Sequence, residues 1–130
     1  MNDLMDWTLC FRRKYGFSNR ARILSDLTNF LQDNDVKKMA VNGKCILGGY
    51  VYGHRKFADD SLILTSNIVT IAKEDDSLCA TTASGNNYYI SIQDAERGMK
   101  ILLKDAMDGK INDEPGFYLD EPYKNEELFI

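Results

Sequence analysis

The chain has 130 residues, of which 44% are hydrophobic and 28% are charged, so we expect one globular domain with its own core. No stretch approaches the roughly 20 consecutive apolar residues of a membrane helix, and the acidic start MNDLMDWTLC does not resemble a signal peptide. Three Cys residues without a C-x-x-C pair exclude a zinc knuckle and a thioredoxin motif. We therefore expect a cytoplasmic protein with free thiols, no metal, no cofactor and no membrane contact.

The formal net charge of -4 is unevenly distributed along the chain. Residues 1–65 hold ten Lys or Arg and seven Asp or Glu (10 - 7 = +3), whereas residues 66–130 hold six and thirteen (6 - 13 = -7). This division indicates either two binding faces or one half of the chain closing on the other.

The first 34 residues are predicted to be helical. Residues 3–15 place Leu4, Trp7, Phe11 and Tyr15 at helical spacing, with Asp3 as a candidate N-cap. Residues 18–32 form a second predicted helix, with an apolar stripe from Ile23 to Leu31. We expect Arg20 and Arg22 to face away from that stripe.

Residues 44–92 change to a strand pattern. Five short strands are predicted over 46–52, 62–66, 67–73, 78–83 and 87–92, separated by turn residues. Their spacing favours a curled antiparallel sheet or a small SH3-like barrel, and Gly48 and Gly49 indicate a bulge or sharp bend within it.

A third helix is expected over residues 93–109, started by a capping box of Ser91 and Asp94 and covering the sheet. An acidic arm follows over residues 110–130. The predicted fold is therefore a single α+β domain with two N-terminal helices, a five-stranded curled antiparallel sheet or small barrel, one covering helix and this arm.

The segment GHRKFADDSLILTSNI and the segment TTASGNNYYI carry a recognisable pattern. Residues Gly53, His54, Phe57, Asp59, Ile63, Thr65, Ser66 and Ile68 fit G-H-P-R-F-x-D-G-x-x-I-x-T-S-x-I, and Thr81, Thr82, Ser84, Gly85 and Tyr88 fit the following V-T-T-x-S-G-x-x-Y-x-L. The chain resembles small uncharacterised bacterial and phage-borne proteins with this pattern. The resemblance covers residues 53–90, less than a third of the chain. It implies a fold and a bacterial or phage source, and it implies no reaction.

Turn chemistry explains most of the first segment. Asp59 and Asp60 suit a hairpin tip, because Asp tolerates the left-handed backbone that such tips need. Asp60 stands where the pattern has Gly, and Arg55 and Lys56 stand where it has Pro and Arg. We expect Arg55 and Lys56 to project near the tip and to contact a partner.

His54 is the only His, and it has no second His with which to bind a metal. We expect it to make structural hydrogen bonds. A small hydrolase centred on His54 stays open as an alternative, because a Ser or Cys partner can be distant in sequence. No nucleophile elbow or phosphate-binding loop is present, so a non-enzymatic function is favoured.

A basic run near the N-terminus supports a second alternative, a nucleic-acid-binding accessory or regulatory protein. Its cations are Arg12, Arg13, Lys14, Arg20 and Arg22. The acidic pI of about 4.9 makes direct nucleic-acid binding the less favoured prediction.

The acidic arm supports the favoured function, because spaced carboxylates imitate phosphates. The candidate acids are Asp113, Glu114, Asp120, Glu121, Glu126 and Glu127, and the candidate apolar anchors are Phe117, Tyr118 and Phe129. The sequence thus predicts a protein-binding module of a bacterium or phage. Its most concrete form is an inhibitor of a host nucleic-acid-handling defence complex, such as a CRISPR effector. The oligomeric state is left open.

Overall fold

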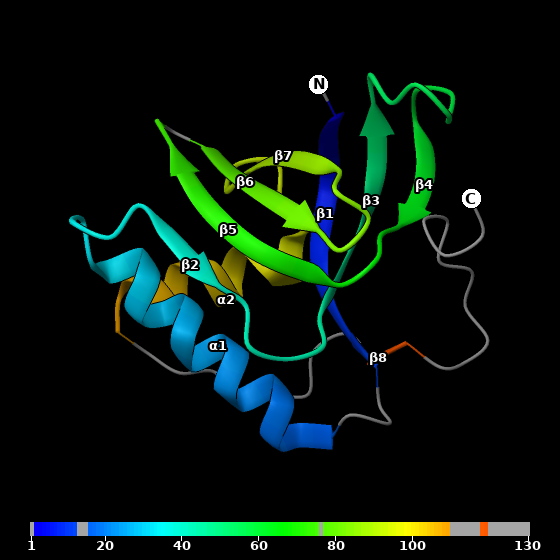
Figure 1. Ribbon diagram of the computed structural model, residues 1–130. Helices are drawn as coiled ribbons and strands as arrows, with labels where there is room; N and C mark the ends of the chain where they lie inside the picture. Colours follow the sequence, from blue (N-terminus) through cyan, green and yellow to red (C-terminus); the bar gives the residue numbers. More distant parts are fainter. Residues whose placement is uncertain (1, 13–15, 76, 110–117, 120–130) are drawn as a thin grey trace.

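A computed structural model describes residues 2–12, 16–75, 77–109 and 118–119 (Figure 1). Its elements in chain order are β1 (Asn2–Arg12), α1 (Gly16–Gln32), β2 (Lys38–Ala40), β3 (Ile46–Tyr52), β4 (Ser61–Leu64), β5 (Ile68–Glu74), β6 (Ser77–Thr82), β7 (Asn87–Ser91), α2 (Arg97–Met107) and β8 (Tyr118–Leu119). No helix within the described residues is long and apolar enough to cross a membrane.

Seven strands form one mixed sheet in the order β2-β5-β6-β7-β1-β3-β4. The β1–β7 pair is parallel, the other neighbours are antiparallel, and β8 adds a short parallel pair to the far end of β1. The predicted five-stranded antiparallel sheet with three helices is therefore wrong. The described residues contain two helices, and only one of them is N-terminal.

Residues 3–15 were expected to be a helix, but residues 2–12 form strand β1. Met5 pairs with Tyr50 and Thr8 with Gly48, so three steps along β1 oppose two along β3. The extra residue makes a bulge at Asp6, whose φ is 50°. The bulge returns Trp7 to the buried face that holds Leu4. Leu4 and Trp7 are therefore three residues apart and yet lie on the same face of a strand. In the sequence, this spacing looks like one turn of an amphipathic helix.

Gly49 lies opposite this bulge. A Cβ added at Gly49 would be 3.1 Å from the Met5 carbonyl oxygen and 3.2 Å from the Cα of Trp7. The irregularity predicted around Gly48 and Gly49 is therefore present, but its extra residue belongs to the neighbouring strand. The lack of a side chain at Gly49 lets the β1 backbone approach closely.

The sheet is strongly curved, and the start of β5 passes close to the start of β3 (Figure 1). The chain between β4 and β5 stays bonded to the start of β3: Thr65 N–H donates to the Leu47 carbonyl at 2.9 Å, and Ile68 N–H donates to the Cys45 carbonyl at 2.7 Å. These bonds satisfy backbone groups where the chain leaves β4 and enters β5.

The two helices lie together against one side of the curled sheet (Figure 1). The core between them is built from fully buried side chains of both layers, which include Leu4, Trp7, Ile23, Met99 and Leu103. A helix is present within the range 93–109 where a covering helix was expected, but α2 begins only at Arg97 and ends at Met107. Its first turn is capped by Glu96, whose carboxylate accepts from Met99 N–H at 3.1 Å, while Ser91 and Asp94 form a separate turn ahead of it.

Candidate functional site

The loop between β3 and β4 is closed by its two Asp residues. Gly53 N–H donates to Asp59 Oδ1 at 3.0 Å, and the Tyr52 hydroxyl donates to Asp60 Oδ1 at 2.8 Å. Asp60 has a φ of 68°, so the predicted left-handed tip is confirmed. Both carboxylates thus shape the loop, although they stay exposed.

His54 belongs to this loop, and its side chain is only 9% exposed. Its Nδ1 accepts a hydrogen bond from Lys56 N–H at 3.0 Å. Its ring centroid is 4.8 Å from that of Phe57 and 6.3 Å from that of buried Tyr88. These contacts support the structural interpretation of His54, because they use the ring to anchor the loop to the core.

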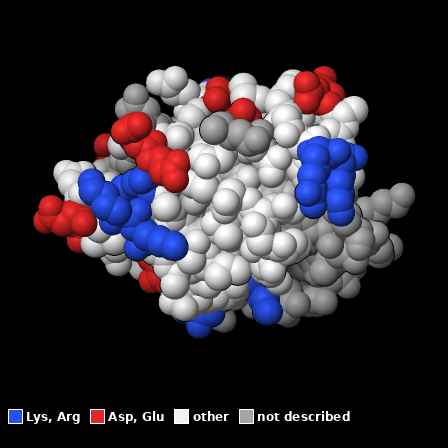
Figure 2. All heavy atoms as spheres, turned by 45° about the horizontal axis from the view of Figure 1, so that its top comes forward, with Lys and Arg blue, Asp and Glu red and all other residues white. Residues whose placement is uncertain are grey.

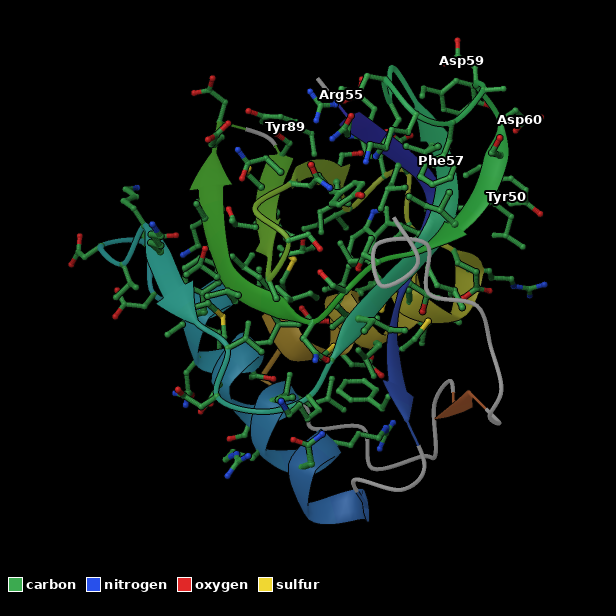
Figure 3. The ribbon with its side chains drawn as sticks, turned by 45° about the vertical axis from the view of Figure 1, so that its right-hand side comes forward. Tyr50, Arg55, Phe57, Asp59, Asp60 and Tyr89 are labelled. Carbon is green, nitrogen blue, oxygen red and sulfur yellow. The ribbon has the colours of Figure 1, made fainter. Side chains whose placement is uncertain are left out.

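Arg55 and Lys56 are exposed on the same loop, as predicted. In Figure 3 Arg55 lies at the end of the molecule that also carries the loop tip with Asp59. Whether a partner contacts the two cations stays a prediction.

The hydroxyl residues of the pattern meet at one corner. Thr65 Oγ1 accepts from Leu47 N–H at 3.0 Å, and Ser66 Oγ accepts from Ser84 N–H at 3.2 Å. The Ser84 hydroxyl is 3.1 Å from Ser66 Oγ. These bonds connect the residues just before β5 to the β6–β7 turn. The hydroxyl residues in both halves of the pattern therefore stabilise the fold.

A pocket of about 910 Å³ opens on the outer face of the sheet, where β1, β3 and β7 approach the β5–β6 turn. Its lining comprises Asp3, Leu4, Met5, Tyr52, Glu74, Asp75, Ser77, Tyr89, Ile90, Ser91, Gln93 and Asp94. This volume lies within the range typical of ligand sites in proteins. Because the lining comes from both halves of the chain, the pocket depends on the pairing of β1 with β3 and β7.

The floor of the pocket is one cross-strand row. Asp3 pairs with Tyr89 of β7 on one side and with Tyr52 of β3 on the other. Directly opposite residues of neighbouring strands place their side chains on the same face. The Asp3 carboxylate therefore lies between two tyrosine side chains.

Both tyrosines keep their phenol protons. The hydrogen bond to Asp60 is the main cause that raises the pKa of Tyr52. The pKa of Tyr89 is raised first by Cys79, which pairs with it on β6, and then by the carboxylate of Glu74. The two rings are thus neutral hydrogen-bonding aromatics at physiological pH.

The charge of the pocket is all of one sign. Of the described residues that line it, four carry a carboxylate and none carries an ammonium or guanidinium group. The four acids are Asp3, Glu74, Asp75 and Asp94. In Figure 2, which is tilted from Figure 1 so that its top comes forward, acidic and basic side chains both lie around a broad uncharged area of the surface. This pocket is the candidate functional site.

Of the predicted basic run, the structure describes the side chains of Arg20 and Arg22. Arg12 ends β1, Arg13 and Lys14 lie outside the described residues, and Arg22 is exposed on α1. Arg20 was expected to face solvent, but it is only 4% exposed. The expectation was wrong because Arg20 precedes Ile23, Leu24 and Leu27 by three, four and seven residues, which places it on the buried stripe of the helix.

Most of the acidic arm lies outside the described residues. Asp113, Glu114, Phe117, Asp120, Glu121, Glu126, Glu127 and Phe129 all lie outside the described residues. Tyr118 is the exception: its backbone pairs with Phe11 of β1 through β8. The role assigned to the arm stays a prediction.

No protein-family model, curated protein or solved structure matches this chain in the comparisons made with each. The resemblance of residues 53–90 to bacterial and phage-borne proteins therefore stays a prediction.

Sequence reasoning missed the pocket residues. Asp3 looked like the cap of a helix, and Tyr52 and Tyr89 looked like ordinary strand residues. The available signal was the alternation of β7, which puts Tyr89 on the outer face opposite buried Tyr88 and Ile90. The pairing of that face with Asp3 could be found only from the strand register.

Proposed function

We propose that this protein is a non-enzymatic binding module that takes a Lys or Arg side chain of a protein partner into its acidic pocket. The observation that carries the proposal is the Tyr89–Asp3–Tyr52 row, in a pocket that Glu74 and Asp75 also line.

The chemistry of the row suits an organic cation. A cation over a tyrosine ring is attracted by the negative face of the ring, and a carboxylate beside it adds a charge-assisted hydrogen bond. Arginine fits best, because its planar guanidinium group stacks on an aromatic ring while its N–H groups reach a carboxylate. The 910 Å³ volume also accommodates residues that flank the cation.

A host nucleic-acid-handling complex is the partner that the sequence favours. The acidic pocket supports this choice, because such a complex presents cationic side chains that the pocket can bind. Grooves that hold nucleic acid present Lys and Arg to phosphates. An acidic pocket that captures one of those cations would compete with the nucleic acid. In this form the pocket acts together with, or in place of, the acids of residues 110–130.

The two alternatives receive less support from the described residues. A hydrolase centred on His54 needs the imidazole at an accessible site, whereas the ring is buried between Phe57 and Tyr88. A nucleic-acid interface on the basic run would lose Arg20, which is buried.

A titration tests the proposal. The full chain, labelled with ¹⁵N, is titrated with the capped peptides Ser-Ser-Arg-Ser-Ser and Ser-Ser-Gln-Ser-Ser, and amide shifts are followed by NMR. We expect the Arg peptide to bind at the pocket and the Gln peptide to bind at least about fivefold more weakly, since exposed charge contacts contribute up to about 1 kcal/mol each.

A matched pair of variants locates the binding. The double variant Asp3→Asn/Glu74→Gln should weaken the Arg peptide about fivefold. The control Asp35→Asn/Asp108→Asn changes the same charge at two exposed positions away from the pocket and should leave the affinity unchanged. Equal binding of the Arg and Gln peptides, or equal loss in both double variants, contradicts the proposal. So does tight binding of a mixed-sequence DNA 20-mer that the pocket variant leaves unaffected.

A further inference from the structure

A second cross-strand row lies beside the pocket on the same outer face. Met5 of β1 pairs with Tyr50 of β3, and Tyr50 pairs with Leu62 of β4. Their exposed fractions are 38% for Met5, 38% for Tyr50 and 62% for Leu62. Three neighbouring strands thus present a continuous apolar row to solvent, and Figure 3 shows Tyr50 pointing away from the body of the molecule.

The apolar row and the pocket row form one surface. Asp3 and Met5 are two residues apart on β1, and Tyr52 and Tyr50 are two apart on β3. Residues two apart in a strand share a face and are separated by about 7 Å. Met5 also lines the pocket. The acidic site therefore continues directly into the apolar row.

The edge position of β4 leaves this row open at one side. β4 is the last strand of the sheet and is paired only with β3 among the described strands. Exposed sheet edges are commonly blunted by charged residues or by a covering segment. Leu62 is the most exposed large hydrophobic side chain among the described residues, although it lies on this edge strand.

We propose that the pocket and the apolar row together bind one extended partner segment, in which an apolar side chain lies two residues from the cation. This inference rests on the proposed function and names its partner more closely. Charge complementarity places the cation in the four-carboxylate pocket. An extended segment then presents its next same-face side chain about 7 Å away, which is the separation of the two rows. That side chain meets Met5, Tyr50 and Leu62.

Three capped peptides test this arrangement with the full chain. Leu-Ser-Arg-Ser-Leu places a Leu two residues from the Arg in either chain direction, Ser-Ser-Arg-Ser-Ser lacks the apolar groups, and Leu-Ser-Gln-Ser-Leu lacks the cation. We expect the first to bind roughly tenfold tighter than the second, because one Leu side chain is buried. It should also shift the amide signals of residues 50 and 61–64.

Variants of the row separate this inference from the proposed function. Leu62→Ser and Tyr50→Ser remove exposed apolar surface, and each should reduce the preference for the Leu-containing Arg peptide to about twofold or less. Val69→Ser is the control, since Val69 is 47% exposed on a different strand, β5, and should keep the full preference.

Each outcome decides between the two proposals. If both Arg peptides bind equally and the Asp3→Asn/Glu74→Gln variant weakens both, the apolar row plays no part and only the proposed function stands. If neither Arg peptide binds, both proposals fail. If sedimentation shows a wild-type dimer that Leu62→Ser dissociates, a second copy covers the row and the inference is overturned.

Discussion

Asp60 meets two local requirements at the tip of the β3–β4 loop. Its backbone has a φ of 68°, and its carboxylate accepts the Tyr52 hydroxyl. Replacing Asp60 with Gly or with Ala removes the carboxylate in both cases, but only Gly adopts the positive φ without strain. We therefore expect Asp60→Ala to be less stable than Asp60→Gly by about 1 kcal/mol in urea denaturation. Equal stability of the two variants would show that the loop relaxes to another conformation.

Cys10 makes the stability of the protein depend on pH in the alkaline range. Burial raises the pKa of its thiol from 9.0 to about 12, and a backbone hydrogen bond with Gly48 offsets only part of the shift. Above pH 9 the unfolded chain loses this proton while the folded chain keeps it, so the free energy of unfolding falls as the pH rises. From pH 8 to pH 10 the loss due to Cys10 should be about 1.4 kcal/mol.

The variant Cys10→Ala isolates this contribution. Urea denaturation of both proteins at pH 8 and pH 10 includes the same Tyr and Lys titrations, so these cancel in the comparison. We expect the wild type to lose about 1.4 kcal/mol more than the variant over this interval. Parallel losses would mean that the thiol titrates alike in the folded and unfolded chains.

At the scale of elements, Lys73 of β5 joins the sheet to the C-terminal end of α1. Its Nζ donates to the carbonyls of Phe30 at 2.5 Å, Asp33 at 2.6 Å and Val36 at 3.0 Å. It also lies 4.3 Å from the centroid of the Phe30 ring. A cation at this position satisfies carbonyls that the end of a helix leaves without partners, and it complements the helix dipole.

Lys73→Met should therefore destabilise the fold by about 2 kcal/mol, since charge-assisted hydrogen bonds are lost while the apolar stem is kept. Lys38→Met, at an exposed position on neighbouring β2, should change stability by about 0.5 kcal/mol or less. Chemical denaturation of both variants measures the difference. Similar effects of the two substitutions would remove the assigned role of Lys73.

The elements also show which features local patterns can predict. Strand 87–92 and the helix that begins near residue 18 follow from alternation and from an apolar stripe, and they are present as β7 and α1. β1 was not predicted as a strand, because the Asp6 bulge interrupts its alternation of buried and exposed residues. β2 was not predicted either, because its three mostly exposed residues show no hydrophobic periodicity. For the site, turn chemistry predicted the Asp60 tip, whereas the Tyr89–Asp3–Tyr52 row arises from pairing between distant segments that no local pattern encodes.

At the scale of the whole molecule, that pairing means that the charge difference between the two halves of the chain does not correspond to two separate surfaces. The N-terminal half carries a surplus of cations, and yet it supplies Asp3 to the pocket, while Glu74, Asp75 and Asp94 come from the acidic half. The parallel β1–β7 contact thus gathers four carboxylates at one site. Meanwhile Arg55 and Lys56 are exposed on the loop that follows β3.

This gathered charge predicts how binding depends on salt. The Debye length falls from about 30 Å at 0.01 M salt to about 10 Å at 0.1 M, so attraction of a cationic segment by several carboxylates weakens over this range. We expect the dissociation constant of the Leu-Ser-Arg-Ser-Leu peptide to rise about threefold between 20 and 200 mM NaCl. In the Asp3→Asn/Glu74→Gln variant the rise should be clearly smaller, because two of the four carboxylates are replaced by neutral amides.

The apolar contact with Leu62 is insensitive to this screening, so Leu62→Ser should weaken binding by the same factor at both salt concentrations. A salt dependence that the pocket variant retains in full would assign the attraction to charges elsewhere on the chain.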